Sequence, residues 1–161
     1  MRVWTETNVF SLVWWIILIT FITAWLIWWK YVDRTRLLEI VCAGLLAALL
    51  TTVLDLIGAE NILWGYPNML LPIVPPLLFM NFGIFPVIYM LIYQKFSSWK
   101  SFSIAVSVTA FFISFVGEPL AIRLDIYELN NWKHIYSFPI YIVIGIIIKW
   151  LMNKISEKQK R

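Results

Sequence analysis

Five long runs of apolar residues, separated by short polar connectors, dominate the pattern of the chain. A helix needs roughly 20 apolar residues to cross about 30 Å of hydrocarbon, and each run is close to that length. The pattern predicts an all-α protein, an integral membrane bundle of five transmembrane helices in one domain over residues 1–161, with a short basic C-terminal tail. The predicted spans cover about residues 9–29, 37–58, 69–93, 101–122 and 135–152.

The third run differs from the others because it is rich in proline. A proline beyond the first helical turn removes a backbone hydrogen bond and bends the helix. In lipid, the freed carbonyls need partners, so such a segment is tolerated where it faces protein or a wet cavity. We therefore expect a proline-kinked third helix. The prolines concerned are Pro67, Pro72, Pro75, Pro76 and Pro86.

The composition supports a membrane protein. Of the 161 residues, 61% are apolar and 14% are charged, whereas soluble domains carry about 25% charged residues. The net charge of +4 suits anionic lipid headgroups better than nucleic acid, because the basic residues lie between the apolar runs. We expect membrane lipids as partners, with no nucleic acid. Because Cys42 is the one cysteine and His134 the one histidine, we expect no internal disulfide, metal site or cofactor.

The basic residues also predict an orientation. Arg2, Arg123 and Lys133 fall at one end of the predicted bundle, and ten basic residues fall at the other. The positive-inside rule then places the N-terminus outside and the C-terminus in the cytoplasm. Most tryptophans lie near span ends, as interfacial anchors do. The ten basic residues are Lys30, Arg34, Arg36, Lys95, Lys100, Lys149, Lys154, Lys158, Lys160 and Arg161.

Two carboxylates lie near the outer ends of predicted spans. Asp55 and Glu118 end the second and fourth spans, which both run outward, so they share a similar depth. An acid within the bilayer costs about 2.5–3.5 kcal/mol at its centre, so such groups are paired or functional. We expect Glu118 to face the bundle interior and both acids to join an outward-facing aromatic pocket. The candidate ligand-binding residues are Asp55, Trp64, Tyr66, Asn81, Glu118, Arg123, Trp132 and His134.

Purely structural roles are the alternative explanation for Asp55, Glu118 and His134. Glu118 and Arg123 could pair if Pro119 distorts the turn between them, and Asp55 could bond a backbone amide freed by the prolines. His134 could be a solvated histidine at the interface. The chain has no nucleophile elbow, phosphate-binding glycine loop or paired Asp/Glu motif, which argues against the common enzyme classes.

Two stretches carry a resemblance to known families. "NNWKHIYSFPIYIVIG" after "GEP", together with "LDLIGAENILWGYPN", resembles a family of small uncharacterised multi-pass membrane proteins of Gram-positive spore formers. That resemblance implies a bacterial cell membrane. Asp55 and the Trp64-Gly65-Tyr66 turn nine residues later are also similar to membrane-embedded lycopene cyclases. Leucines 77 and 78 stand where that family has a Glu-Glu pair, so this second resemblance implies no cyclase chemistry.

Three functions remain open from the sequence. The first is a non-enzymatic membrane protein that binds a lipid-like or small amphipathic ligand in the pocket. The second is a membrane enzyme that acts on an isoprenoid or lipid, with Glu118 or Asp55 as proton donor. The third is a small transporter or an assembly subunit, which leaves oligomerisation open.

Overall fold

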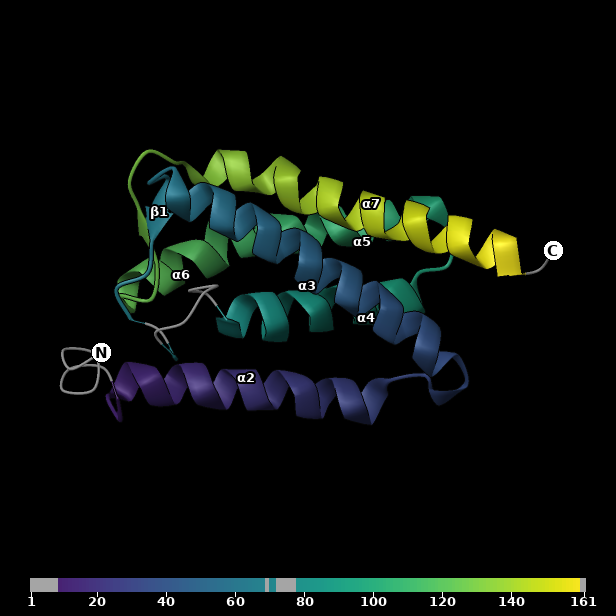
Figure 1. The fold of residues 1–161 in the computed structure, drawn as a ribbon, viewed down its shortest axis with the longest axis horizontal. Helices are drawn as coiled ribbons and strands as arrows, with labels where there is room; N and C mark the ends of the chain where they lie inside the picture. Colours follow the sequence, from purple (N-terminus) through teal and green to yellow (C-terminus); the bar gives the residue numbers. More distant parts are fainter. Residues whose placement is uncertain (1–8, 69, 72–77, 160–161) are drawn as a thin grey trace.

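The computed structural model describes residues 9–68, 70–71 and 78–159, and it is almost entirely helical. The elements are α2 (Leu12–Tyr31), the 3-10 turn η1 (Arg34–Arg36), α3 (Leu37–Glu60), β1 (Trp64–Gly65), the π turn η2 (Met80–Ile84), α4 (Phe85–Lys95), α5 (Trp99–Phe112), the π turn η3 (Ile113–Gly117), α6 (Glu118–Arg123), β2 (Glu128–Leu129) and α7 (His134–Gln159) (Figure 1).

Four helices of the described chain are long and apolar enough to cross a membrane, which confirms the all-α class. They are Leu12–Tyr31, Arg34–Glu60, Trp99–Arg123 and His134–Lys158. Their bounds lie close to four of the predicted spans, except that α7 continues through the predicted polar tail.

The helical part of the third run begins at residue 78 and ends at Lys95, so it is shorter than the predicted span 69–93 at its first end. Residues 69 and 72–77 lie outside the described chain, and with them the predicted kinks at Pro72, Pro75 and Pro76.

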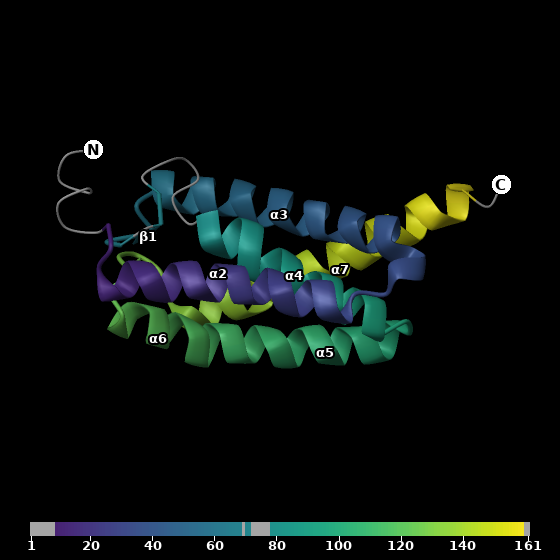
Figure 2. The same ribbon diagram turned by 90° about the horizontal axis from the view of Figure 1, so that it is seen from below.

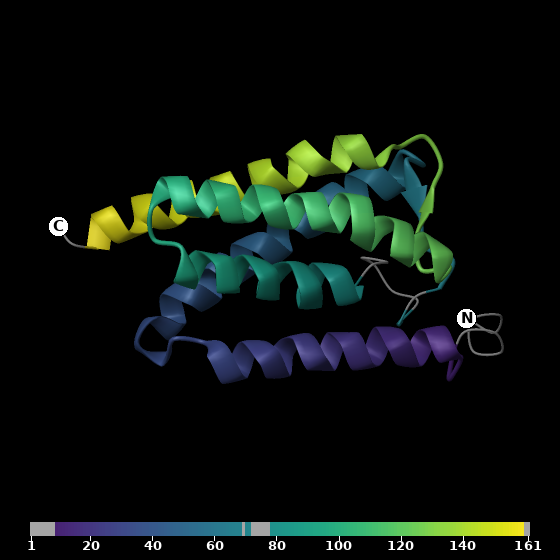
Figure 3. The same cartoon turned by 180° about the vertical axis from the view of Figure 1, so that it is seen from behind.

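Helix α4 lies in the middle of the bundle, packed against α2, α3 and α5 (Figure 2). Seen from behind, α5 and α6 run as one continuous rod above α4, and α7 begins above this rod and slants behind it (Figure 3). Apolar side chains on every side of α4 are buried, among them Val87, Tyr89, Met90 and Ile92. Helix α2, by contrast, buries only Ile17 and Trp28. A helix that is apolar all round and mostly exposed suits contact with lipid.

Two of the prolines directly follow π turns. Pro86 and Pro119 each occupy the first turn of an α-helix that continues from a π turn. In these turns the N–H of Phe85 bonds the carbonyl of Met80, and the N–H of Glu118 bonds that of Ile113. Each bond spans one residue more than in an α-helix, and such turns are frequent at functional sites. At Pro86, therefore, the predicted distortion of the third run takes the form of a π turn.

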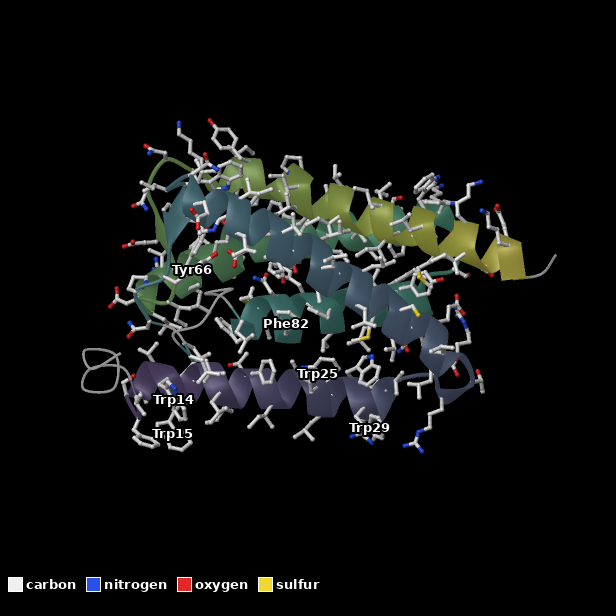
Figure 4. The ribbon with its side chains drawn as sticks, in the orientation of Figure 1. Trp14, Trp15, Trp25, Trp29, Tyr66 and Phe82 are labelled. Carbon is white, nitrogen blue, oxygen red and sulfur yellow. The ribbon has the colours of Figure 1, made fainter. Side chains whose placement is uncertain are left out.

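Tryptophans attach α2 to the rest of the bundle. The indole N–H of Trp14 donates to the carbonyl of Leu70 at 3.1 Å, and that of Trp25 donates to the carbonyl of Phe82 at 3.1 Å. The neighbouring Trp15 and Trp29 point away from the bundle (Figure 4) and are 44% and 59% exposed. Helix α2 thus directs Trp14 and Trp25 toward the rest of the protein, and Trp15 and Trp29 toward its surroundings.

The two ends of the bundle are closed by different means. At one end, Lys149 of α7 is buried, and its ammonium donates to the carbonyls of Phe96 and Ser97 at 2.9 and 2.8 Å. These carbonyls lie just beyond the C-terminus of α4, where a cation also suits the helix dipole.

At the other end, β1 pairs antiparallel with β2, with Trp64 opposite Leu129. Ile62, just before β1, has a φ of 54°, a conformation that a β-branched residue rarely adopts. We call this the β1–β2 end.

Candidate functional site

A cavity of about 370 Å³ opens between the long helices toward the β1–β2 end. Apolar side chains, aliphatic and aromatic, form most of its wall, such as Ile17 of α2, Leu54 of α3 and Ile144 of α7. Its volume is at the lower end of the range for small-molecule pockets. Polar side chains enter the wall from helices, as with Asp55, Glu118 and Ser137, and from the loops and η2, as with Tyr66, Tyr127 and Asn81.

Asp55 joins three segments of the chain at one side of the cavity. Its carboxylate accepts hydrogen bonds from the Trp64 indole at 3.1 Å, from the Tyr66 hydroxyl, and from the Asn81 side-chain amide at 2.8 Å. Asp55 is 7% exposed and Asn81 is 1% exposed. All three donors are neutral, so hydrogen bonds rather than an ion pair stabilise the buried carboxylate.

Local sequence explains how these donors reach Asp55. Gly58 lies one turn after Asp55 on α3, and the Trp64 ring packs directly over it. A Cβ at Gly58 would lie 1.9 Å from Cζ2 of Trp64, so only glycine leaves room for the ring. Asn81 belongs to η2, whose π geometry rotates the chain relative to an α-helix.

Glu118, the first residue of α6, has a different set of hydrogen-bond partners, and they belong to α7. It is 6% exposed, and its Oε2 lies 2.6 Å from Nδ1 of His134 while its Oε1 accepts from the Tyr141 hydroxyl at 2.8 Å. Both Glu118 and Asp55 line the cavity, which confirms the prediction that Glu118 faces the interior.

Four aromatic rings surround the carboxylates. Trp64 and Trp132 meet edge to face with centroids 5.1 Å apart, and Tyr66 and Tyr127 lie 5.8 Å apart at a tilt. The Trp132 indole donates to Ser137 at 3.0 Å, which fixes the ring against α7. Burial, and then the Asp55 carboxylate, raises the pKa of Tyr66 well above its usual range. Burial, and then the nearby Glu118 and Asp55, also raises the pKa of Tyr127 well above its usual range.

The charge of the wall is one-sided. Asp55 and Glu118 are its charged residues among those the structure describes, and no lysine, arginine or histidine of the described chain lines it. His134 contacts Glu118 from behind the wall. Within the described ranges no group of three acids, histidines or cysteines could hold a metal ion.

Most of the predicted site residues come together. Six of them line the cavity, and His134 bonds one of the six. Arg123 is exposed, and among the described residues it forms no ion pair with Glu118. Residues five apart on a helix lie on different faces, so the proposed pairing of Glu118 with Arg123 is wrong. The six are Asp55, Trp64, Tyr66, Asn81, Glu118 and Trp132.

The sequence reasoning missed Ser137 and Tyr141, which also line the cavity. A signal for both was present. His134, Ser137 and Tyr141 recur at intervals of three and four residues, which puts their side chains on one face of α7. Extending that face from the predicted His134 would have added the other two.

The fold and site thus define an all-α protein with four helices long and apolar enough to cross a membrane and a partly open cavity with acidic and aromatic groups at one end. Comparison with models of protein families, with curated proteins and with solved structures finds no match.

Proposed function

We propose that the protein is a membrane protein that binds a lipid-like or small amphipathic molecule in the cavity. The observation that carries this proposal is the cavity itself, with mainly apolar walls and polar groups gathered at the β1–β2 end. An amphipathic molecule likewise has an apolar chain and a polar head. Its chain would be buried along the apolar walls, and its head would form hydrogen bonds with the polar groups near the loops. Asp55, Trp64, Tyr66, Asn81, Glu118 and Trp132 would contact it.

The proposal includes a membrane orientation. We place the β1–β2 end outside and the end of Lys149 in the cytoplasm of a bacterial cell, with α4 as a fifth, central span. The opposite positions of the start of α2 and the end of α7 support an odd number of crossings (Figure 1). The excess of basic residues near the end of α7 supports the direction. The resemblance to small multi-pass proteins of Gram-positive spore formers is part of this proposal.

Labelling of single cysteines tests the orientation. In a Cys42→Ser background, cysteine is placed at Asn131, between β2 and α7, or at Lys158, near the end of α7; both positions are exposed. A membrane-impermeant maleimide applied to intact cells is expected to label position 131 and to label position 158 only after the cells are broken. Labelling of both positions in intact cells would contradict the orientation.

Mass spectrometry of gently purified protein tests ligand binding. We expect an amphipathic molecule to copurify in a stoichiometric amount with the unmodified chain. Ala121 lines the cavity, so Ala121→Phe is expected to fill it and to remove the molecule. Leu49→Phe, which enlarges a side chain on the exposed face of α3, is the matched control. If the same amount of the molecule copurifies with Ala121→Phe and with Leu49→Phe, the proposal is refuted.

The contact between Glu118 and His134 supports a second candidate, a membrane enzyme that transfers a proton to its lipid or isoprenoid substrate. A carboxyl group bonded to an imidazole at 2.6 Å can exchange a proton with it. Conversion of the copurified molecule over time, abolished by Glu118→Gln, would select this candidate. A molecule that stays unchanged during incubation would select simple binding.

A further inference from the structure

We propose that the ligand of the cavity carries an organic ammonium group, held at the β1–β2 end by Glu118 and by the rings of Trp64, Tyr66, Tyr127 and Trp132. The inference rests on the proposed function of the cavity and names the chemical class of the head that the site accepts. Three independent properties of the wall support it.

The first property is charge. The described wall holds two carboxylates, and the three donors to Asp55 are neutral. His134 is the one basic side chain of the described residues that contacts either acid. One imidazole can offset at most one of the two acidic side chains. A phosphate or carboxylate head would be repelled there, and a cation would be attracted, because charges interact strongly away from water.

The second property is unused hydrogen-bonding capacity. A carboxylate offers about four acceptor positions. Among the described residues, three donors bond Asp55, whereas Glu118 is bonded by two, His134 and Tyr141. Glu118 therefore keeps room for a ligand, although it is 6% exposed. We assign Asp55 to holding the loops and Glu118 to contacting the head.

The third property is the aromatic surface beside the acids. A cation within about 6 Å of a ring centroid is attracted by the face of that ring, and groups of aromatic residues bind quaternary ammonium ions in this way. The site offers two indoles with centroids 5.1 Å apart and two phenols 5.8 Å apart, all on the wall of one cavity.

A metal cation fits the site less well. Hard cations such as Ca²⁺ take six to eight oxygen ligands, and the described chain has no cluster of three possible metal-binding side chains. The remaining wall is mainly apolar, which suits the chain of an amphiphile rather than the water shell of a metal ion.

Binding of three probes with the same chain tests the inference. Octyltrimethylammonium, octanol and octanoate are titrated into the full-length protein in an uncharged maltoside detergent, and affinity is measured by calorimetry. We expect the cation to bind at least tenfold more tightly than octanol and octanoate to bind most weakly. Glu118→Gln is expected to weaken the cation at least tenfold and to change octanol less than twofold.

Two control substitutions distinguish recognition of the ammonium head from a general effect of substitution on the folded protein. Glu128→Gln removes an exposed acid of β2 at the same end and is expected to leave all three affinities unchanged. Tyr127→Phe keeps a ring and should keep the preference, whereas Tyr127→Leu should reduce it severalfold. If octanol or octanoate binds as tightly as the cation, the ammonium head is refuted while the function of the cavity stands. If none of the three probes binds, both proposals are refuted.

Discussion

The indole N–H of Trp25 donates to the carbonyl oxygen of Phe82 across 3.1 Å, and Phe82 is the residue four before Pro86. In an α-helix that carbonyl would bond the N–H of residue 86, which proline lacks. A side chain from α2 thus supplies the donor that the third run cannot supply for itself. The contact lies between the labelled Trp25 and Phe82 in Figure 4.

Replacing Trp25 by phenylalanine tests this relationship. Trp25→Phe keeps the ring and removes the donor, so we expect it to lower the free energy of unfolding by about 1 kcal/mol, near the upper range for single hydrogen bonds between membrane helices. Unfolding is measured by titration with a denaturing detergent. Trp29→Phe, on the exposed face of α2, is the control and is expected to have little effect.

A double-mutant cycle with Pro86 extends the test. Pro86→Ala restores a backbone N–H, so the loss caused by Trp25→Phe is expected to be smaller in the alanine background. Equal losses in both backgrounds would show that the tryptophan does not compensate for the proline.

Asp55→Asn is expected to destabilise the β1–β2 end. The new amide group can accept at one atom only, so at least one of the donors Trp64, Tyr66 and Asn81 loses its partner. A buried donor left without a partner costs about 1–3 kcal/mol. We expect a loss of about 2 kcal/mol in the free energy of unfolding, measured together with tryptophan fluorescence. Glu60→Gln, an exposed acid at the end of the same helix, should have almost no effect.

Gly58 and Gly117 form a matched pair for a second stability test. A Cβ at Gly58 would clash with the Trp64 ring, whereas at Gly117 the nearest atom, the carbonyl oxygen of Phe112, is 3.8 Å away. Gly58→Ala is expected to displace the ring and to cost about 1–3 kcal/mol, as overpacking does. Gly117→Ala should be neutral or stabilising. A tolerated Gly58→Ala with unchanged tryptophan fluorescence would contradict the packing described.

Tyr66 makes stability depend on pH in the alkaline range. Because burial raises the pKa of Tyr66 in the folded protein, its phenol stays protonated where the unfolded chain ionises at about pH 10. The contribution of Tyr66 to the free energy of unfolding is constant below about pH 10. It declines as the pH rises further, because the unfolded chain then binds fewer protons than the folded protein. The free energy of unfolding should fall from about pH 10 to 11, and less steeply in Tyr66→Phe. An equal slope in both proteins would contradict this.

Hydrophobic pattern predicted the four long helices because each is apolar over a length sufficient to cross a membrane. Pattern also located Asp55 and Glu118, since an acid is conspicuous at the end of an apolar run. It did not separate α4 from the other helices. A central helix is apolar because protein surrounds it, and hydrophobicity alone does not distinguish protein from lipid as the surroundings. The prolines of the third run were the separate indication that this segment faces protein or a wet cavity.

Contacts across the bundle were less accessible to sequence reasoning. Arg123 was a reasonable partner for Glu118 by charge, but helical geometry turns it outward, and His134 and Tyr141 of another helix bond the acid instead. Such partners depend on which helices are neighbours. The π turns before Pro86 and Pro119 likewise arise from proline geometry together with tertiary contacts, and proline alone predicts only a distortion.

The two hydrogen bonds from Lys149 have a consequence for biogenesis. Phe96 and Ser97 are synthesised about fifty residues before the lysine that bonds their carbonyls. Until α7 has been inserted, that turn has no ammonium donor, and the lysine of the arriving helix has no acceptors. A chain that terminates before Lys149 would therefore retain an open α4–α5 turn, and membrane proteases should degrade it faster than a chain that ends just after Lys154.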